Sequence, residues 1–118
     1  KYKESLLKVT EPVIVSETIF VKVNRQLTKV DCNTIISITS NGDYMKILLE
    51  DNSKLHVYGT LTNFSKVIPV FLVRVHRKHI ININKIEQMT EAGLYVKQVY
   101  YPIGKTYVEE LKKQLNIF

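Results

Sequence analysis

Short runs of alternating apolar and polar residues, each closed by turn-forming residues, place the tightest constraint on how this chain can fold. In residues 19–23 the isoleucine and the two valines fall on one face of a strand, as a two-residue period requires. Residues 35–39 and 44–49 form two further runs, and Asn41-Gly42 lies between them. Because Asn-Gly tolerates positive φ, this pair is the strongest hairpin signal in the chain. The pattern predicts antiparallel β structure.

The remaining apolar runs complete a mainly β fold with two short helices. Strands are expected over residues 28–32, 54–58, 70–75, 80–83, 86–89, 94–96 and 99–103. Thr60 is the predicted N-cap of a first helix. Leu61, Phe64 and Ile68 would form the apolar face of that helix, and the proline that follows would end it. A second helix is predicted over residues 108–115, where apolar residues recur at helical spacing.

The length of 118 residues suits one domain with a substantial core. We expect residues 18–118 to form this domain. Residues 1–17 are mixed and polar-leaning, and are expected to be a linker with a short helix near residues 4–8. Since the first residue is lysine and not methionine, we expect a missing upstream region. The single cysteine, Cys32, excludes an internal disulfide and is expected to be a buried small hydrophobe.

The excess positive charge is concentrated in one part of the chain. The whole sequence has 17 Lys and Arg against 11 Asp and Glu, a net charge of +6. Residues 66–105 contain seven of these bases and two of these acids, so 7 − 2 = +5 lies in this segment. A localised positive field is typical of a surface that binds a polyanion, such as nucleic acid or an anionic membrane. A solvated lysine-rich face would have the same composition.

Within that segment, residues 74–82 combine basic side chains with flanking apolar runs and contain no acid. The residues that are basic or can become so are Arg74, His76, Arg77, Lys78 and His79. Crowded like charges repel one another, so a domain that leaves them unpaired is expected to bind an anion. This run is therefore the first candidate for a binding site.

Features of an enzyme or a metal site are weak in this sequence. His76 and His79 have a metal-like spacing, but Arg77 and Lys78 between them would repel a cation. The chain has neither a glycine-rich phosphate loop nor the sequence context of a catalytic triad. We expect no catalytic activity, no cofactor and no metal. The longest apolar runs fall far short of a membrane span, so no contact with a membrane is expected.

Four motifs in a fixed order make the chain similar to a known family. They are Asn41-Gly42-Asp43-Tyr44, Thr60-Leu61, the run from Arg74-Val75-His76-Arg77 to Ile80-Ile81-Asn82, and Pro102-Ile103-Gly104-Lys105 before Tyr107. On these motifs, residues 19–115 resemble the LytTR family, the LytR/AgrA-type DNA-binding domain of bacterial response regulators. The resemblance implies an elongated antiparallel β fold that inserts loops into successive major grooves of paired direct repeats and bends the DNA. By position, the residues that reach the grooves would be Tyr44 with Asn41, then Arg77, then Lys105.

The resemblance also implies a setting for the domain. It would be the effector domain of a cytoplasmic transcription regulator in a two-component phosphorelay, joined upstream to a receiver domain and able to dimerise on DNA. Arg74, His76 and Lys78 would hold or flank the DNA backbone. The sequence departs from the family at several positions, where Lys78 replaces a usual Ser, His79 an aromatic residue, and Lys105 an Arg. Gly104 and Leu72 stand where Ser and Phe are usual.

Two other functions fit the same residues. The basic face could dock an acidic protein partner, or the domain could be a β-rich RNA binder. Single-stranded RNA is bound by aromatic residues on a sheet, and Tyr100-Tyr101 is the only faint candidate for such a platform.

Overall fold

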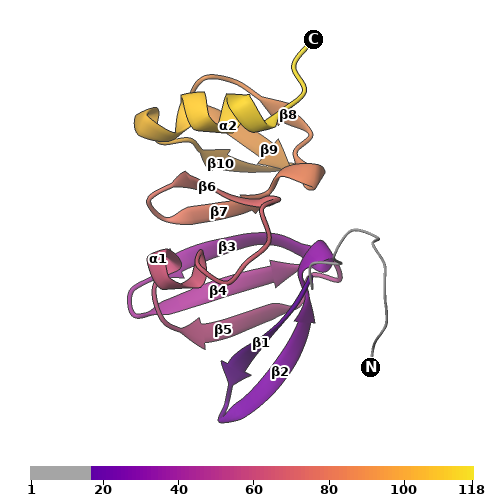
Figure 1. The fold of residues 1–118 in the computed structure, drawn as a ribbon, viewed down its shortest axis with the longest axis vertical. Helices are drawn as coiled ribbons and strands as arrows, with labels where there is room; N and C mark the ends of the chain where they lie inside the picture. The colour runs from indigo at the N-terminus through magenta and orange to yellow at the C-terminus, as the bar shows by residue number, and fades with distance from the viewer. Residues whose placement is uncertain (1–16) are drawn as a thin grey trace, which may run out of the picture.

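The computed structural model describes residues 17–118, which form antiparallel β-sheets with two short α-helices (Figure 1). The sheets have two, five and three strands, in the orders β1-β2, β5-β4-β3-β7-β6 and β10-β9-β8. The strands are β1 (Thr18–Val23), β2 (Gln26–Asp31), β3 (Ile35–Asn41), β4 (Tyr44–Leu49), β5 (Lys54–Tyr58), β6 (Leu72–His76), β7 (His79–Asn82), β8 (Gln88–Met89), β9 (Gly93–Val96) and β10 (Val99–Pro102). The helices are α1 (Leu61–Phe64) and α2 (Val108–Gln114).

The sheets follow one another along the long axis of the molecule, as Figure 1 shows. The predicted fold class, an elongated, mainly β domain with two short helices, is confirmed. Residues 1–16, which contain most of the predicted linker and its short helix, lie outside the described residues.

The β3–β4 hairpin forms where the Asn-Gly pair predicted it, but its loop is shifted by one residue. Asn41 is the last residue of β3 and pairs with Tyr44, so Gly42 and Asp43 form the two-residue loop. Gly42 has φ +65, whereas Asp43 stays at negative φ. Glycine is required at the first loop position because a side chain there would be strained.

Two other hairpins have positive φ at both loop residues although neither residue is glycine. Asn24 and Arg25, between β1 and β2, have φ 50 and 69, and Lys97 and Gln98, between β9 and β10, have φ 50 and 68. Positive φ at both loop positions matches the twist of the flanking strands. These turns lack the strong Asn-Gly signal, so the sequence indicated them only as polar breaks.

Cys32 lies just beyond β2, and not at the end of it as predicted. A short 3₁₀ turn, η1 (Cys32–Thr34), begins here because the Asp31 side chain accepts a hydrogen bond of 3.0 Å from the backbone N–H of Asn33. The thiol is fully buried, which confirms the predicted role of Cys32 as a small core residue. Burial, followed by the charges of Asp31 and Glu17, raises the pKa of Cys32 to about 11, so the thiol stays protonated at neutral pH.

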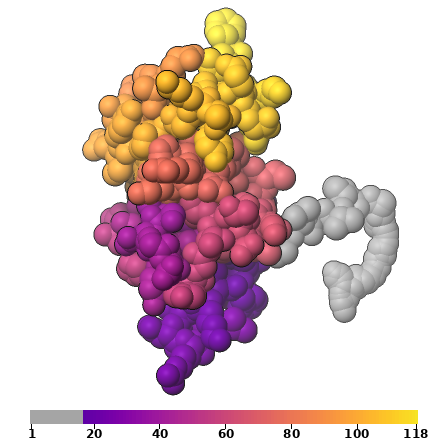
Figure 2. Space-filling model, turned by 90° about the vertical axis from the view of Figure 1, so that its left-hand side faces the viewer, coloured from indigo at the N-terminus to yellow at the C-terminus, as the bar shows by residue number. Residues whose placement is uncertain are grey.

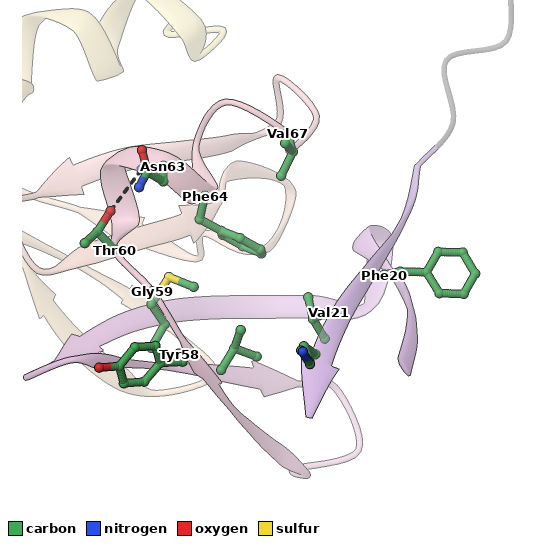
Figure 3. Close-up of a pocket in the computed structure, with 11 residues that line it drawn as sticks. Phe20, Val21, Tyr58, Gly59, Thr60, Asn63, Phe64 and Val67 are labelled. Carbon is green, nitrogen blue, oxygen red and sulfur yellow. Dashed lines mark hydrogen bonds between the residues drawn. The ribbon is translucent and has the colours of Figure 1, made fainter. Parts of the chain in front are cut away.

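Helix α1 starts as predicted but ends early. The Thr60 hydroxyl oxygen accepts a hydrogen bond of 3.2 Å from the N–H of Asn63, which confirms the predicted N-cap (Figure 3). The helix ends after Phe64, where the Ser65 hydroxyl donates to the carbonyl of Thr62. Such local bonds compete with helix propagation. Ile68 nevertheless packs against the same core as Phe64, through the turn that follows the helix.

Three strands differ in their bounds from the prediction: β6 and β8 are shorter, and β7 keeps its length but is shifted by one residue. Strand β6 begins at Leu72, because Val70 is 87% exposed and has left the sheet. Strand β7 ends at Asn82, whose side chain accepts from the N–H of Asn84 and starts the 3₁₀ turn η2 (Ile83–Lys85). This turn directly precedes the expected strand 86–89. Only Gln88–Met89 of that strand form β8.

The five-stranded sheet has a core on each face. The neighbours Leu72 and Val73, like Ile80 and Ile81, belong to different clusters of buried residues, as alternation along a strand requires. One cluster involves β1, β2 and α1, and the other involves β9, β10 and α2. Among residues 17–118, no helix is long and apolar enough to cross a membrane.

Candidate nucleic-acid interface

Backbone hydrogen bonds bring the three predicted loops together along one edge of the molecule. The N–H of Ser40, at the end of β3, donates to the carbonyl of Lys78 in the β6–β7 turn over 2.9 Å. The N–H of Gly104 donates to the carbonyl of Val75 in β6 over 2.8 Å. The β3–β4 tip, the β6–β7 turn and the start of η3 (Lys105–Tyr107) are therefore neighbours, and Figure 2 shows this edge.

The β3–β4 tip presents an exposed aromatic pair. Tyr44 is 49% exposed and meets Tyr58 of β5 edge to face, with ring centroids 5.0 Å apart at 80°. Tyr58 is still more exposed, at 70%. The N–H of Gly59 donates to the carbonyl of Asp43 over 3.0 Å, so the end of β5 also supports the hairpin loop. Tyr58 was not predicted as a site residue, because its proximity to Tyr44 depends on the register between β4 and β5.

The β6–β7 turn exposes Arg77 and Lys78. Within residues 17–118, neither side chain forms a hydrogen bond or ion pair with another residue. Both cations are therefore available to an external anion, as the sequence predicted.

Arg74 differs from these two, since it is half-buried and bonded within the protein. Its Nε donates to the carbonyl of His76 over 3.1 Å, and its Nη2 donates to the carbonyl of Arg77 over 2.7 Å. A weaker contact of 3.4 Å joins Nη1 to the hydroxyl of Thr62 in α1. The expectation that the basic run is left unpaired is therefore wrong for Arg74.

The two histidines of the run also have internal partners. His76 Nδ1 accepts a hydrogen bond of 3.1 Å from the N–H of Lys78, and His79 Nδ1 lies 3.1 Å from the Thr39 hydroxyl. The His79 ring meets Tyr101 edge to face, with centroids 5.4 Å apart. Burial, followed by the nearby charges of His76 and Lys78, lowers the pKa of His79 to about 4. His79 is therefore neutral at physiological pH and adds no positive charge to the edge.

The rings of His76 and His79 lie 5.3 Å apart between centroids. No group of three or more His, Cys, Asp or Glu side chains suited to a metal ion occurs in residues 17–118. The two rings have the partners described above, so their proximity has a structural explanation.

Lys105 is exposed and begins a 3₁₀ turn, whereas α2 starts three residues later at Val108. Its side chain, like those in the β6–β7 turn, bonds no other described residue. The preceding Gly104 has an ordinary φ of −70, so its backbone does not require glycine. A Cβ at Gly104 would instead lie 2.9 Å from the ring of Tyr107, so close packing explains the glycine.

Two other bases of the segment have partners inside the domain. Lys85 forms an ion pair with Glu50, and the Lys97 amine donates to the carbonyl of Glu50 over 3.0 Å. The cations of residues 66–105 whose side chains have no partner in the described residues are therefore Lys66, Arg77, Lys78 and Lys105. The last three lie on the loop edge.

A mainly β domain that presents free cations and exposed polar side chains on adjacent loops has the features of a nucleic-acid-binding domain. The model of the LytTr DNA-binding domain family matches residues 13–116. The chain belongs to the LytTR family and is a DNA-binding domain. The predicted resemblance is thereby confirmed.

A search of curated proteins finds no match to this chain. Among solved structures, the chain is similar to the LytTr DNA-binding domain assigned to a methyl-accepting/DNA response regulator from Bacillus cereus. The TM-score is 0.70 at 18% identity, and the alignment covers 86% of this chain and 98% of the other. At this identity, the similarity supports a shared fold.

Proposed function

We propose that this chain is the effector domain of a transcriptional response regulator and binds double-stranded DNA with sequence specificity. The proposed contacts are made by loops that enter successive major grooves of paired direct repeats. The domain has no catalytic activity of its own and requires no cofactor.

The observation that carries this proposal is the alignment of three loops on one edge, each with an exposed side chain able to contact a base. Asn41 and Tyr44 lie at the first loop, Arg77 at the second and Lys105 at the third. The Arg guanidinium matches guanine O6 and N7 in a bidentate fork, and an Asn amide matches adenine N6 and N7. Lys78, beside Arg77 in the same turn, is assigned to a phosphate, to which its ammonium group can donate whatever the base sequence.

We further infer a cytoplasmic, bacterial setting, with a receiver domain upstream in a two-component phosphorelay and with dimerisation on DNA. The membership of the LytTR family supports this setting, as does the similarity in fold to a domain assigned to a response regulator. Residues 1–17 would then be the linker to the upstream region.

The two alternatives receive less support. Tyr101, one of the two candidates for an RNA-stacking platform, is buried, and its hydroxyl lies 2.8 Å from that of Ser37. Tyr100 is paired edge to face with Tyr95. An acidic protein partner would suit the charge of the loop edge but would not require base-reading side chains on three loops.

The proposal is tested by selecting duplexes from a random-sequence library with the purified domain at moderate salt. We expect enrichment of two similar half-sites whose centres are separated by roughly one or two helical turns. The selected duplex should outcompete a scrambled duplex and a single-stranded RNA of the same length. Absence of any enriched sequence, or equal competition by the RNA, would contradict the proposal.

A further inference from the structure

We propose that Arg74 and His76 are positioning residues, which hold the backbone of the Arg77–Lys78 turn in the shape that presents Arg77 to DNA. In this assignment Arg74 contacts no phosphate. The inference rests on the proposed function, because it explains how the Arg77 contact is built.

Arg74 bonds two successive carbonyl groups of the turn. Its Nε and Nη2 donate to the carbonyl oxygens of His76 and Arg77 over 3.1 and 2.7 Å. The planar guanidinium can make both bonds at once because its N–H groups point in fixed directions. Both peptide planes are thereby oriented, and the carbonyl groups on either side of the Arg77 Cα cannot rotate freely.

Two further bonds hold the N–H side of the Arg77–Lys78 peptide group and the end of the turn. His76 Nδ1 accepts from the N–H of Lys78 over 3.1 Å, and the carbonyl of Lys78 accepts from the N–H of Ser40 over 2.9 Å. Four polar groups of the turn backbone, namely the carbonyls of His76, Arg77 and Lys78 and the N–H of Lys78, therefore have partners, although the side chains of Arg77 and Lys78 are exposed. A loop ordered before binding loses less conformational entropy when it binds.

The position of Arg74 supports a role inside the protein. The residue is half-buried in β6, and its third nitrogen lies 3.4 Å from the Thr62 hydroxyl of α1. All three guanidinium nitrogens are thus directed at protein oxygens. Arg77, in contrast, is exposed and bonds no other described residue. The bonded Arg74 therefore holds the backbone of the turn from which the free Arg77 side chain projects.

The test compares Arg74→Lys, which keeps the charge, with Arg74→Ala, which removes it. The affinity of each variant is measured for a duplex selected by the parent domain and for a scrambled duplex. Lysine keeps the charge but cannot bond two carbonyl groups in fixed directions. We expect Arg74→Lys to approach the loss of Arg77→Ala on the selected duplex, roughly 5- to 150-fold, and to bind the scrambled duplex like the parent. Lys113→Ala, which removes an exposed charge from α2, is the control for net charge.

The salt dependence gives a second readout. Loss of a phosphate contact lowers the slope of log K against log salt by about 0.9. We expect Arg74→Ala to leave this slope unchanged on the selected duplex. We also expect the double variant Arg74→Lys/Arg77→Ala to bind no worse than Arg77→Ala alone, because both substitutions remove the same contact.

His76 offers a rescue that a purely structural role would not predict. An Asn side chain can accept from the N–H two residues ahead, as His76 Nδ1 does, whereas Leu cannot. We expect His76→Asn to retain selected-duplex affinity within a few-fold and His76→Leu to lose it, at similar melting temperatures.

Each other outcome is decisive. If Arg74→Lys binds both duplexes like the parent, the inference is wrong, and a fall of about 0.9 in the salt slope of Arg74→Ala would make Arg74 a phosphate contact. If Arg77→Ala has no effect on the selected duplex, the assignment of Arg77 in the proposed function fails, and the inference fails with it. Should Arg74→Ala not fold, Arg74→Lys still decides between the two assignments.

Discussion

The backbone N–H of Ser40 donates a 2.9 Å hydrogen bond to the carbonyl oxygen of Lys78, which joins the end of β3 to the β6–β7 turn. The adjacent residues form a second link, since the Thr39 hydroxyl oxygen lies 3.1 Å from Nδ1 of His79. Two loops that are far apart in the sequence thus become one surface.

Salt should weaken DNA binding steeply. With roughly four to six phosphate contacts, log K should fall against log salt with a slope of about −4 to −5, because bound cations displace condensed counterions. Titration of a duplex across a range of salt concentrations measures the slope. A slope near zero, or no binding even at low salt, would contradict the proposal that these loops bind DNA.

Arg77 and Lys78 should have different roles although they are neighbours. Arg77→Ala should cost roughly 1–3 kcal/mol on the selected duplex and little on scrambled DNA, because a base-edge contact is specific. Lys78→Ala should weaken both duplexes about equally and reduce the salt slope by about one unit. Affinities of both variants on both duplexes test this division. Equal losses on every duplex would indicate a simple basic face.

Lys105 should contribute to binding and not to stability. Its exposed side chain has no partner in residues 17–118, so Lys105→Ala should leave the melting temperature unchanged while weakening binding to the selected duplex. Lys105→Arg should be tolerated and should sharpen discrimination at a guanine, because arginine supplies the bidentate fork. Thermal melts and competition assays measure the two effects. If Lys105→Ala binds as well as the parent, the third loop makes no contact.

Tyr58 should support Tyr44 at the first loop. Removal of the edge-to-face contact by Tyr58→Ala should weaken binding to the selected duplex by roughly 2- to 12-fold, given the usual energy of an aromatic pair. Tyr95→Ala is a matched control, since Tyr95 and Tyr100 form a similar exposed pair, 5.3 Å between centroids, on another sheet. Equal losses for the two variants would show that the effect is general destabilisation.

His79 should make stability depend on pH. Its pKa in the folded protein is about 4, below the ordinary value of 6.5, so the unfolded chain binds the proton first as the pH falls. The stabilising contribution is therefore complete above pH 6.5 and is lost progressively towards pH 4.

His79→Phe tests this prediction, because it keeps a ring against Tyr101 and removes the titrating group. Denaturant unfolding at several pH values should show a flatter dependence between pH 6.5 and 4 than in the parent. The lost bond to Thr39 is expected to cost about 1 kcal/mol at every pH. His56→Gln, which removes an exposed histidine of β5, is the control. An unchanged pH dependence in His79→Phe would assign the effect to other groups.

Much of the fold could be predicted because its signals are local. Alternation located the strands of the central sheet, Asn41-Gly42 located its first hairpin, and Thr60 located the start of α1. The errors occurred where a local bond competed with a longer element, as Asp31 does by starting a 3₁₀ turn at the predicted last residue of β2. Such competition depends on single hydrogen bonds that periodicity does not report.

The sequence by itself determined where the charge is concentrated and which segments are extended. Its resemblance to the family also predicts DNA contacts at Asn41, Arg77 and Lys105. Only the tertiary structure decided which cations are free, because the partners of Arg74 and Lys85 come from turns and from residues distant in the chain. It also decided that Tyr58 joins the first loop and that His79 is neutral. The physical reason is that strand order and register set which side chains meet and how deeply they are buried, whereas local sequence sets only what each segment can form.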